Sequence, residues 1–221
     1  MKMIVFGATG MIGQGVLREC LRDPRVTEVV TIGRAATGRQ DPKLREVVHA
    51  DLYDLTPIAA DLAGTDACFF CLGVTSAGKT EAEYRRITYD LTMAAARPLA
   101  AANPAATFIY VSGAGTDSTE QGRTMWARVK GATENALFAL PFHAYAFRPG
   151  YIHPMHGVTS RTRWYRWLYV VAKPLYPIAR RIWRDQLTTS EALGRAMITV
   201  AVGGWPSKIL NPADINAAAA A

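Results

Sequence analysis

A glycine-rich turn near residue 10 is the part of the sequence with the clearest chemistry. The apolar run Ile4–Phe6 leads into Gly7, Gly10 and Gly13, and the amphipathic stretch Ile12–Leu21 follows. The first glycine permits a tight turn, the second lets the backbone approach a phosphate, and the third lets a helix pack close to its strand. A strand, a glycine turn and a helix start together predict a site for the pyrophosphate of a dinucleotide. The residues expected to contact it are Gly7, Thr9, Gly10, Met11, Ile12 and Gly13.

The end of the second apolar run bears on which nicotinamide dinucleotide would bind. In such a unit an acidic residue at this point holds the ribose 2′-hydroxyl, whereas an arginine accommodates a 2′-phosphate. Here the run ends in Arg34, and Arg39 and Lys43 follow in the same loop. We therefore predict NADP rather than NAD, the alternative being that Arg34 is a solvated loop arginine. Asp51, followed by Leu52, is expected either to accept a hydrogen bond from the adenine amino group or to cap a helix.

Apolar runs and helical patterns alternate along the chain, which predicts an α/β fold with a Rossmann-like, doubly wound parallel sheet and a small helical C-terminal lobe. The expected strands are 4–6, 29–32, 46–49, 67–72, 107–111 and 145–148, and the expected helices are 12–21, 57–62, 81–102 and 124–140. The alanine run 217–221 reads as a frayed tail, an added sequence or residues of unassigned identity.

Length and composition favour one domain over residues 1–221, with 151–221 contributing the C-terminal lobe, because half of the residues are hydrophobic and no linker interrupts the chain. The first apolar run is too short for a signal sequence, and no run approaches the roughly 20 apolar residues of a membrane span. These features lead us to expect a cytoplasmic protein.

The three cysteines are Cys20, Cys68 and Cys71. The last two have the spacing of a redox motif, but they lie in one expected strand, so their thiols should point to opposite faces. We interpret all three as core cysteines and predict no metal site.

Further motifs follow in a fixed order along the first part of the chain: Gly33-Arg34, Asp51-Leu52, Cys71-Leu72-Gly73, Val111-Ser112, Val129-Lys130-Gly131 and Arg148-Pro149-Gly150. Over about residues 1–157, the chain resembles the short-chain dehydrogenase/reductase superfamily. The resemblance is to its atypical branch, which is related to NAD(P)-binding epimerase-like proteins and to Tat-interacting-protein-like oxidoreductases. It implies that Leu72, Gly73, Arg148 and Pro149 also line the cofactor site.

The resemblance also implies a catalytic set in which a lysine binds the nicotinamide ribose, a tyrosine transfers a proton and a serine orients the substrate oxygen. Ser112 matches the serine and Lys130 matches the lysine, but the tyrosine position, four residues before the lysine, is Trp126. Indole does not exchange a proton near neutral pH. Thr88 is a second departure, because it stands where many extended members carry asparagine.

Two side chains near the end of the resemblance are candidates to replace the tyrosine. Tyr151, or His153, would donate a proton from a different wall of the site, and His156 follows shortly after. The alternative is that each is a structural loop residue.

A basic and aromatic segment, residues 157–184, carries the whole excess of positive charge, because it contains seven of the 25 basic residues of the chain and none of the 18 acidic ones. Its tryptophans fall on one helical face and its arginines on another. Three interpretations stay open: a lobe that covers an anionic substrate, a helix that lies on acidic lipid, and a surface for a partner or a second copy. No nucleic-acid motif accompanies the segment.

Two functions are consistent with these features. The first is an NADP-dependent oxidoreductase or epimerase-like enzyme acting on a small substrate. The second is an NADPH-dependent sensor or regulatory protein that keeps the cofactor site and has lost proton transfer.

Overall fold

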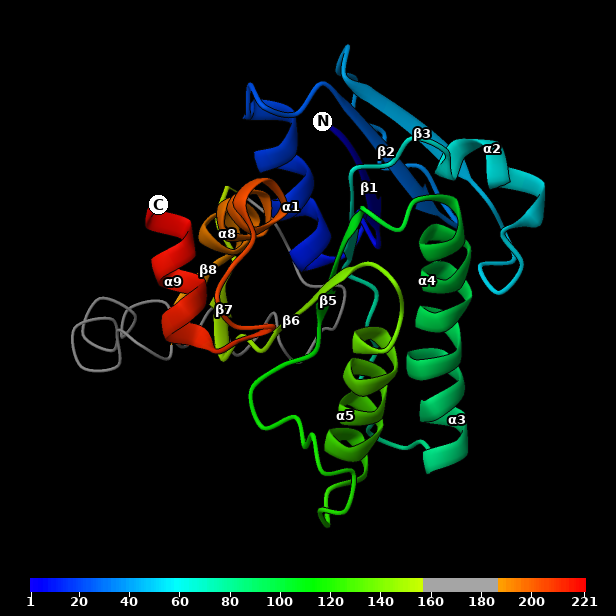
Figure 1. Ribbon diagram of the computed structural model, residues 1–221, viewed down its shortest axis with the longest axis vertical. Coiled ribbons are helices and arrows are strands. Elements are labelled where there is room, and N and C mark those ends of the chain that lie inside the picture. Colours follow the sequence, from blue (N-terminus) through cyan, green and yellow to red (C-terminus); the bar gives the residue numbers. More distant parts are fainter. Residues whose placement is uncertain (157–186) are drawn as a thin grey trace.

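The computed structural model describes residues 1–156 and 187–221 (Figure 1). Its strands are β1 (Lys2–Phe6), β2 (Glu28–Gly33), β3 (Leu44–Val48), β4 (Ala67–Phe70), β5 (Thr107–Val111), β6 (His143–Phe147), β7 (Tyr151–His153), β8 (Leu187–Thr189) and β9 (Ile209–Leu210). Seven of these form one parallel sheet in the order β3-β2-β1-β4-β5-β6-β9, and β7 pairs with β8 in a separate small sheet. The doubly wound, Rossmann-like architecture is therefore confirmed.

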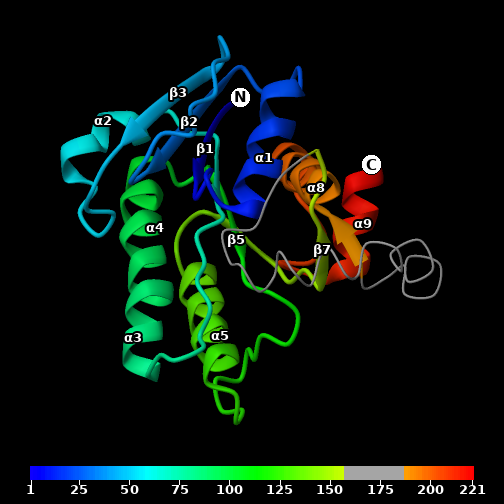
Figure 2. The same cartoon turned by 180° about the vertical axis from the view of Figure 1, so that it is seen from behind.

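Helices cover both faces of the large sheet (Figure 1 and Figure 2). They are α1 (Met11–Arg22), α2 (Ala59–Leu62), α3 (Glu81–Arg85), α4 (Leu91–Ala102), α5 (Met125–Phe138), α8 (Ser190–Gly203) and α9 (Pro212–Ala220). Alternate residues of β1 separate the two cores. Met3 and Val5 pack with α1 and α8, whereas Ile4 and Phe6 pack on the side of α4 and α5. Strands that are apolar along their whole length need such cover on both faces of the sheet.

The third expected helix region is not one regular helix. Residues 81–102 form α3, a π-helical turn over Arg86–Asp90, and α4, which contains Pro98. A turn of this kind inserts an extra residue into the helix, and hydrophobic periodicity carries no signal for it. Thr88, one of the two departures from the family pattern, lies within the π-helical turn and is buried.

Residues 187–221 add helices and a strand to the layers that the earlier residues form. Helix α8 packs so closely on α1 that a Cβ added to Gly15 would lie 2.7 Å from the Ser190 Cβ, and one added to Gly194 would lie 2.9 Å from the Glu19 Cγ. Strand β9 adds to β6 at the end of the sheet.

The expectation of a frayed tail at 217–221 is wrong up to residue 220. Helix α9 extends to Ala220, Asn211 and Asp214 form a capping box at its start, and Ala218 is buried. A capped helix with a buried face has both of the features that fraying ends lack.

The cysteines lie where the strand pattern predicts. Cys68 packs in the core beside α4, whereas Cys71 contacts the core beside α1, so the two thiols are on opposite faces of the sheet. Burial raises the pKa of Cys71 to about 12 and that of Cys68 well above its ordinary value. Thiols with such raised pKa values are poor nucleophiles, which fits a structural role.

Candidate functional site

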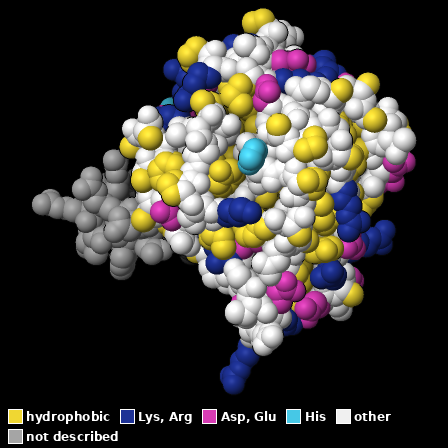
Figure 3. Space-filling view, viewed as in Figure 1, with side chains coloured by type: hydrophobic (Ala, Val, Ile, Leu, Met, Phe, Trp, Pro, Cys, Tyr) yellow, Lys and Arg dark blue, Asp and Glu magenta, His cyan; other side chains and the backbone are white. Residues whose placement is uncertain are grey.

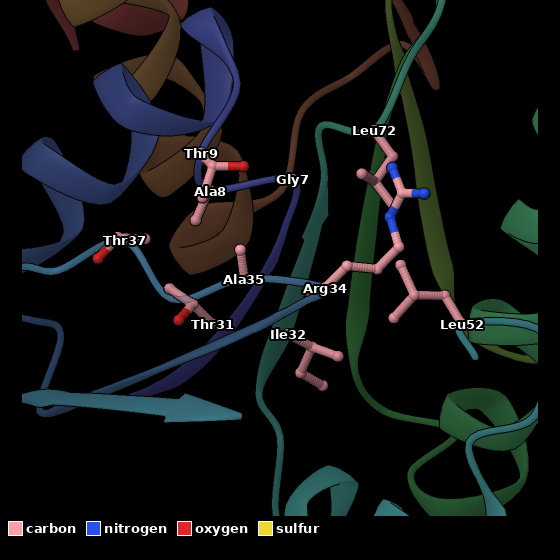
Figure 4. A pocket seen from close by; sticks show the side chains of 11 residues that line it. Gly7, Ala8, Thr9, Thr31, Ile32, Arg34, Ala35, Thr37, Leu52 and Leu72 are labelled. Carbon is pink, nitrogen blue, oxygen red and sulfur yellow. The ribbon is translucent and has the colours of Figure 1, made fainter. Parts of the chain in front are cut away.

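A cavity of about 300 Å³ opens at the carboxyl ends of β1 and β2 (Figure 4). Strand order reverses here, because β2 and β3 lie on one side of β1 while β4 and the later strands lie on the other. Open α/β sheets bind ligands at this switch point. The residues that line the cavity are Gly7, Ala8, Thr9, Thr31, Ile32, Gly33, Arg34, Ala35, Thr37, Leu52 and Leu72.

The turn after β1 is shaped by its first glycine. Gly7 has φ +78°, and its carbonyl accepts a 2.9 Å hydrogen bond from the Gly10 N–H. A Cβ at Gly7 would lie 2.9 Å from the backbone of Cys71 and from the Leu72 nitrogen. A side chain at this position would therefore be strained by its φ angle and would collide with the chain that leaves β4.

Helix α1 follows Thr9, the last residue of the turn that lines the cavity, whereas Gly10, Met11, Ile12 and Gly13 are not among the lining residues. Gly10 is the N-cap, and no acidic residue occupies the first turn, to which Met11 and Ile12 belong. First-turn N–H groups have no acceptor within their own helix, so they form an anion-binding end. A Cβ at Gly13 would lie 2.1 Å from the Gly7 carbonyl oxygen, so this close approach of helix and turn requires glycine.

Arg34 is the charged side chain that lines the cavity. Figure 4 shows it extending from the end of β2 towards Leu52 and Leu72. Within residues 1–156 and 187–221, no hydrogen bond or ion pair engages its exposed guanidinium. An arginine with no carboxylate partner is available for an anionic ligand.

The other basic residues of this loop lie elsewhere. The Lys43 ammonium donates a 2.9 Å hydrogen bond to the Asp23 carbonyl at the end of α1, and Arg39 lines a different surface hollow beside Arg18 and Arg22. Neither side chain therefore joins Arg34 in the cavity.

The cavity wall includes Leu52 and Leu72 but not their neighbours Asp51 and Gly73, which the sequence predicts as cofactor contacts. The Asp51 carboxylate accepts a 2.9 Å hydrogen bond from the Tyr53 N–H. This bond closes a turn, and the next helical turn starts at Thr56, so the helix-capping alternative for Asp51 is wrong.

Ser112 and Lys130 are brought together at the end of β5. The Lys130 ammonium donates a hydrogen bond to the Ser112 carbonyl, and the buried Ser112 hydroxyl donates one of 3.2 Å to the Phe147 carbonyl. Burial lowers the pKa of Lys130 to about 8, and the nearby Glu134 carboxylate partly opposes this shift. The lysine is therefore mostly protonated at neutral pH and remains a hydrogen-bond donor.

Trp126 lies one helical turn before Lys130 in α5 and is partly buried. Its indole packs against the loop after β5, where a Cβ on Gly115 would lie 3.3 Å from the ring. The structure thus holds an indole, which has an N–H but no transferable proton, at the place where the family pattern has a tyrosine.

Arg148 is held away from the cavity. Its guanidinium donates two hydrogen bonds, of 3.1 and 2.5 Å, to the fully buried Glu134 carboxylate and one of 2.5 Å to the Ser118 hydroxyl. The Pro149 carbonyl accepts a 2.9 Å hydrogen bond from Ala114 in the loop after β5. Both residues therefore fix the loop beside Ser112, and neither lines the cavity.

The alternative proton donors belong to the small sheet. Tyr151 and His153 are partly buried in β7, whereas His156 forms a 2.7 Å hydrogen bond with the Glu191 carboxylate of α8. We expect this hydrogen bond to hold the His156 imidazole against α8. The basic and aromatic segment 157–184 lies outside the described residues.

Several residues that line the cavity were not predicted from the sequence, namely Ala8, Thr31, Ile32, Ala35 and Thr37. Thr37 lines the cavity, and its N–H and hydroxyl both donate to the Glu46 carboxylate of β3. The pairing depends on which residues of two strands stand opposite each other, and a single sequence carries no reliable signal for that register.

Comparison with known proteins agrees with this geometry. The sequence profile of a family described as NAD(P)H-binding matches residues 7–140. The chain is 30% identical over 156 residues to the protein fmp52, mitochondrial, of Emericella nidulans, covering 67% of this chain and 65% of that protein. It is 31% identical over 155 residues to fmp52-1, mitochondrial, of Aspergillus terreus, with the same coverage of 67% and 65%. The matched region thus spans slightly less than two thirds of these relatives.

Solved structures share the fold. The enzyme WbmH of Bordetella bronchiseptica, in complex with NAD+, matches with a TM-score of 0.62 and 18% identity over 91% of this chain and 72% of its own. The dTDP-glucose 4,6-dehydratase DesIV of Streptomyces venezuelae, with NAD and TYD bound, matches with a TM-score of 0.65 and 17% identity over 95% of this chain and 74% of its own.

The comparisons correct one expectation. The names of the fmp52 relatives describe them as mitochondrial, which contradicts the cytoplasmic location expected from the sequence. That expectation rested on the lack of a signal sequence and a long apolar run. Within the described part of the chain, no helix has the length and apolar character of a membrane span.

Proposed function

Since the chain belongs to the NAD(P)H-binding family and is of the atypical short-chain dehydrogenase/reductase type, we propose that it is an NADP(H)-dependent oxidoreductase or epimerase-like enzyme that acts on a small substrate. The observation that carries the preference for NADP is the Arg34 guanidinium in the cavity, which is unpaired among the described residues. A 2′-phosphate would supply the partner that this arginine lacks. NAD, which the solved neighbours bind, is the alternative cofactor.

The residues present fit a dinucleotide. A side chain at Gly7 or Gly13 would occupy backbone space, and the N-terminal turn of α1 beside them supplies N–H donors for a pyrophosphate. We assign Thr9, which lines the cavity, and Met11 and Ile12 of the first turn of α1 to this end of the cofactor site. We assign Leu52 and Leu72 of the cavity wall to its adenine end.

The chemistry would take place at the end of β5. A bound NADPH supplies a hydride there. Lys130 binds the ribose hydroxyls through its ammonium, and Ser112 orients a substrate oxygen once its hydroxyl turns away from the Phe147 carbonyl. With Trp126 unable to transfer a proton, Tyr151 or an ordered water would protonate that oxygen. Residues 151–221 contribute the lobe that selects the substrate.

Binding of the two reduced cofactors tests the proposal first. We expect energy transfer from tryptophan to the reduced nicotinamide on titration with NADPH, and at least tenfold weaker binding of NADH. Gly10→Asp should abolish both signals, because it adds a carboxylate where the pyrophosphate lies. Arg34→Glu should weaken NADPH binding by about 10- to 100-fold, since it replaces attraction by repulsion, and should leave NADH binding within about threefold.

Three results would contradict the proposal. They are failure of the unmodified protein to bind either cofactor, equal affinity for the two, and loss of both affinities in Arg34→Glu. Arg39→Glu is the matched control, because this arginine of the same loop lies outside the cavity.

The second candidate function is a regulatory protein that binds NADPH without turnover, and Trp126 is the observation that favours it. Trp126→Tyr separates the two functions, because it supplies the missing hydroxyl in a pocket of similar size. We expect this change to raise NADPH-dependent reduction of a panel of aromatic aldehydes and quinones by at least tenfold, since general acid catalysis contributes about 10²–10⁴-fold.

Trp126→Phe is the control, because it removes the indole and adds no hydroxyl. Equal rates in the tyrosine and phenylalanine variants would show that the geometry around Ser112 and Lys130 does not support reduction, and the regulatory function would then be preferred.

A further inference from the structure

Thr37 anchors the loop between β2 and β3 to Glu46 of β3. The Thr37 N–H donates a 2.6 Å hydrogen bond to a carboxylate oxygen of Glu46, and the Thr37 hydroxyl donates to the same oxygen. That hydroxyl also accepts a 3.2 Å hydrogen bond from the Arg39 N–H. The hydroxyl therefore uses its one donor on the carboxylate and one of its two acceptor lone pairs on the loop backbone.

The register of the sheet places Glu46 beside a residue of the cavity wall. Thr31 of β2 stands opposite Glu46 of β3, and Thr31 lines the cavity. Side chains of neighbouring strands that stand opposite each other point to the same face of a sheet. Glu46 thus neighbours Thr31 and is bonded to Thr37, which both line the cavity, although Glu46 does not itself line it.

Thr37 stands between this carboxylate and the cavity. It lines the cavity and is bonded to Glu46, whereas Arg34 extends from the same loop towards Leu52 and Leu72 (Figure 4). A carboxylate near the ribose ordinarily binds the free 2′-hydroxyl and repels a 2′-phosphate. The charge that would favour NADH is therefore present in this fold, but one of its oxygens is occupied by two donors from Thr37.

We propose that Thr37 is a specificity-determining residue that makes the cavity selective for a 2′-phosphorylated dinucleotide by holding the Glu46 carboxylate away from the ribose. This inference rests on the proposed function. It assigns the selectivity to two opposing groups: the Arg34 guanidinium attracts the phosphate, and the Thr37 hydroxyl keeps the opposing charge engaged.

The experiment compares Thr37→Val, Thr37→Ser, Glu46→Gln and the double variant Thr37→Val/Glu46→Gln with the unmodified protein. Calorimetric titration with NADPH, NADH, adenosine 2′,5′-bisphosphate and 5′-AMP gives four dissociation constants for each. The two half-ligands report on the adenosine end alone. Thr37→Val keeps the side-chain shape and removes the hydroxyl, so we expect about tenfold weaker binding of both 2′-phosphorylated ligands and unchanged or tighter binding of the other two.

The other variants separate a specific role from loop anchoring. Thr37→Ser should behave like the unmodified protein, and Glu46→Gln should keep or increase the preference for NADPH. The double variant should recover that preference, because it removes the carboxylate, which in Thr37→Val is held by the backbone N–H alone. Equal weakening of all four ligands in Thr37→Val, or a double variant with the same low preference, would overturn the inference and leave Thr37 as a loop anchor.

The proposed function fails in a different way. If the unmodified protein bound none of the four ligands, the cofactor assignment would be wrong. The inference about Thr37 would then be wrong as well, without any comparison of variants. If the unmodified protein bound NADPH and NADH equally, selectivity would be absent and Thr37 could not determine it.

Discussion

Glu134→Ala is expected to lower the free energy of unfolding by about 3–5 kcal/mol. The Glu134 side chain is fully buried, the Arg148 side chain is 14% exposed, and the two form a bidentate ion pair. Removing the carboxylate leaves the guanidinium charged and largely buried, with the Ser118 hydroxyl as its remaining side-chain partner among the described residues. Denaturant unfolding followed by circular dichroism measures the change.

Two controls show whether the loss comes from the unpaired charge. Glu134→Met/Arg148→Met replaces both partners by apolar groups, and it should be markedly more stable than the single variant. Glu81→Ala breaks the ion pair with Arg128, in which the Glu81 side chain is 50% exposed, and should cost at most about 1 kcal/mol. A loss in Glu134→Ala as small as that in Glu81→Ala would contradict the account of a buried, energetically important pair.

Gly13→Val is expected to weaken NADPH binding at least 100-fold and to lower the free energy of unfolding by about 1–3 kcal/mol. The added Cβ would lie 2.1 Å from the Gly7 carbonyl oxygen and 2.8 Å from the Ala8 Cα, so α1 must move away from the turn. That movement displaces the N–H groups of Met11 and Ile12 from the pyrophosphate. Fluorescence titration and denaturant unfolding measure the two effects separately.

A glycine in open space provides the matched control. Gly203 is the last residue of α8, and a Cβ there meets no atom within 4 Å. Gly203→Ala should leave NADPH binding unchanged and raise stability by about 0.5–1 kcal/mol, because alanine favours helix. Normal NADPH affinity in Gly13→Val would mean that the glycine turn does not bind the cofactor.

The central part of the fold could be predicted because its local signals and its tertiary role agree. Strands β1, β2, β4 and β5 are buried on both faces, so they appear in the sequence as continuous apolar runs bounded by glycine or polar residues. The glycine turn could be predicted for the same reason, since Gly7 needs a positive φ and Gly13 needs the absence of a Cβ.

The features that sequence reasoning missed depend on distant partners. The two-residue strand β9 forms by pairing with the edge of β6. The position of α8 depends on the close contact with α1 that Gly15 and Gly194 allow. Strand register places Glu46 opposite Thr31, which lines the cavity, and a hydrogen bond to the Asp23 carbonyl holds the Lys43 ammonium outside the cavity. In each case the residue that decides the structure is far away in the sequence, so local hydrophobic periodicity and secondary-structure propensity cannot indicate it.

The role of each charged residue is a further feature that depends on its spatial neighbours. The basic residues of the described chain are distributed over the surface, as the face in Figure 3 shows, and many are paired with acidic partners. The informative cation is Arg34, which is distinguished by its place in the cavity wall and by having no partner in the part of the chain that the structure describes.

The packing of α1 on α8 has a consequence for biosynthesis. Helix α1 leaves the ribosome early, but Ser190 and Gly194, which receive its Gly15 and Glu19, are translated near the end of the described chain. Until then Val16, Leu17 and Cys20, which are buried in the finished protein, lack the α8 surface that covers them. Between the synthesis of α1 and that of α8, the nascent chain therefore carries an amphipathic helix whose apolar face is uncovered, and we expect chaperones that bind exposed apolar segments to recognise it.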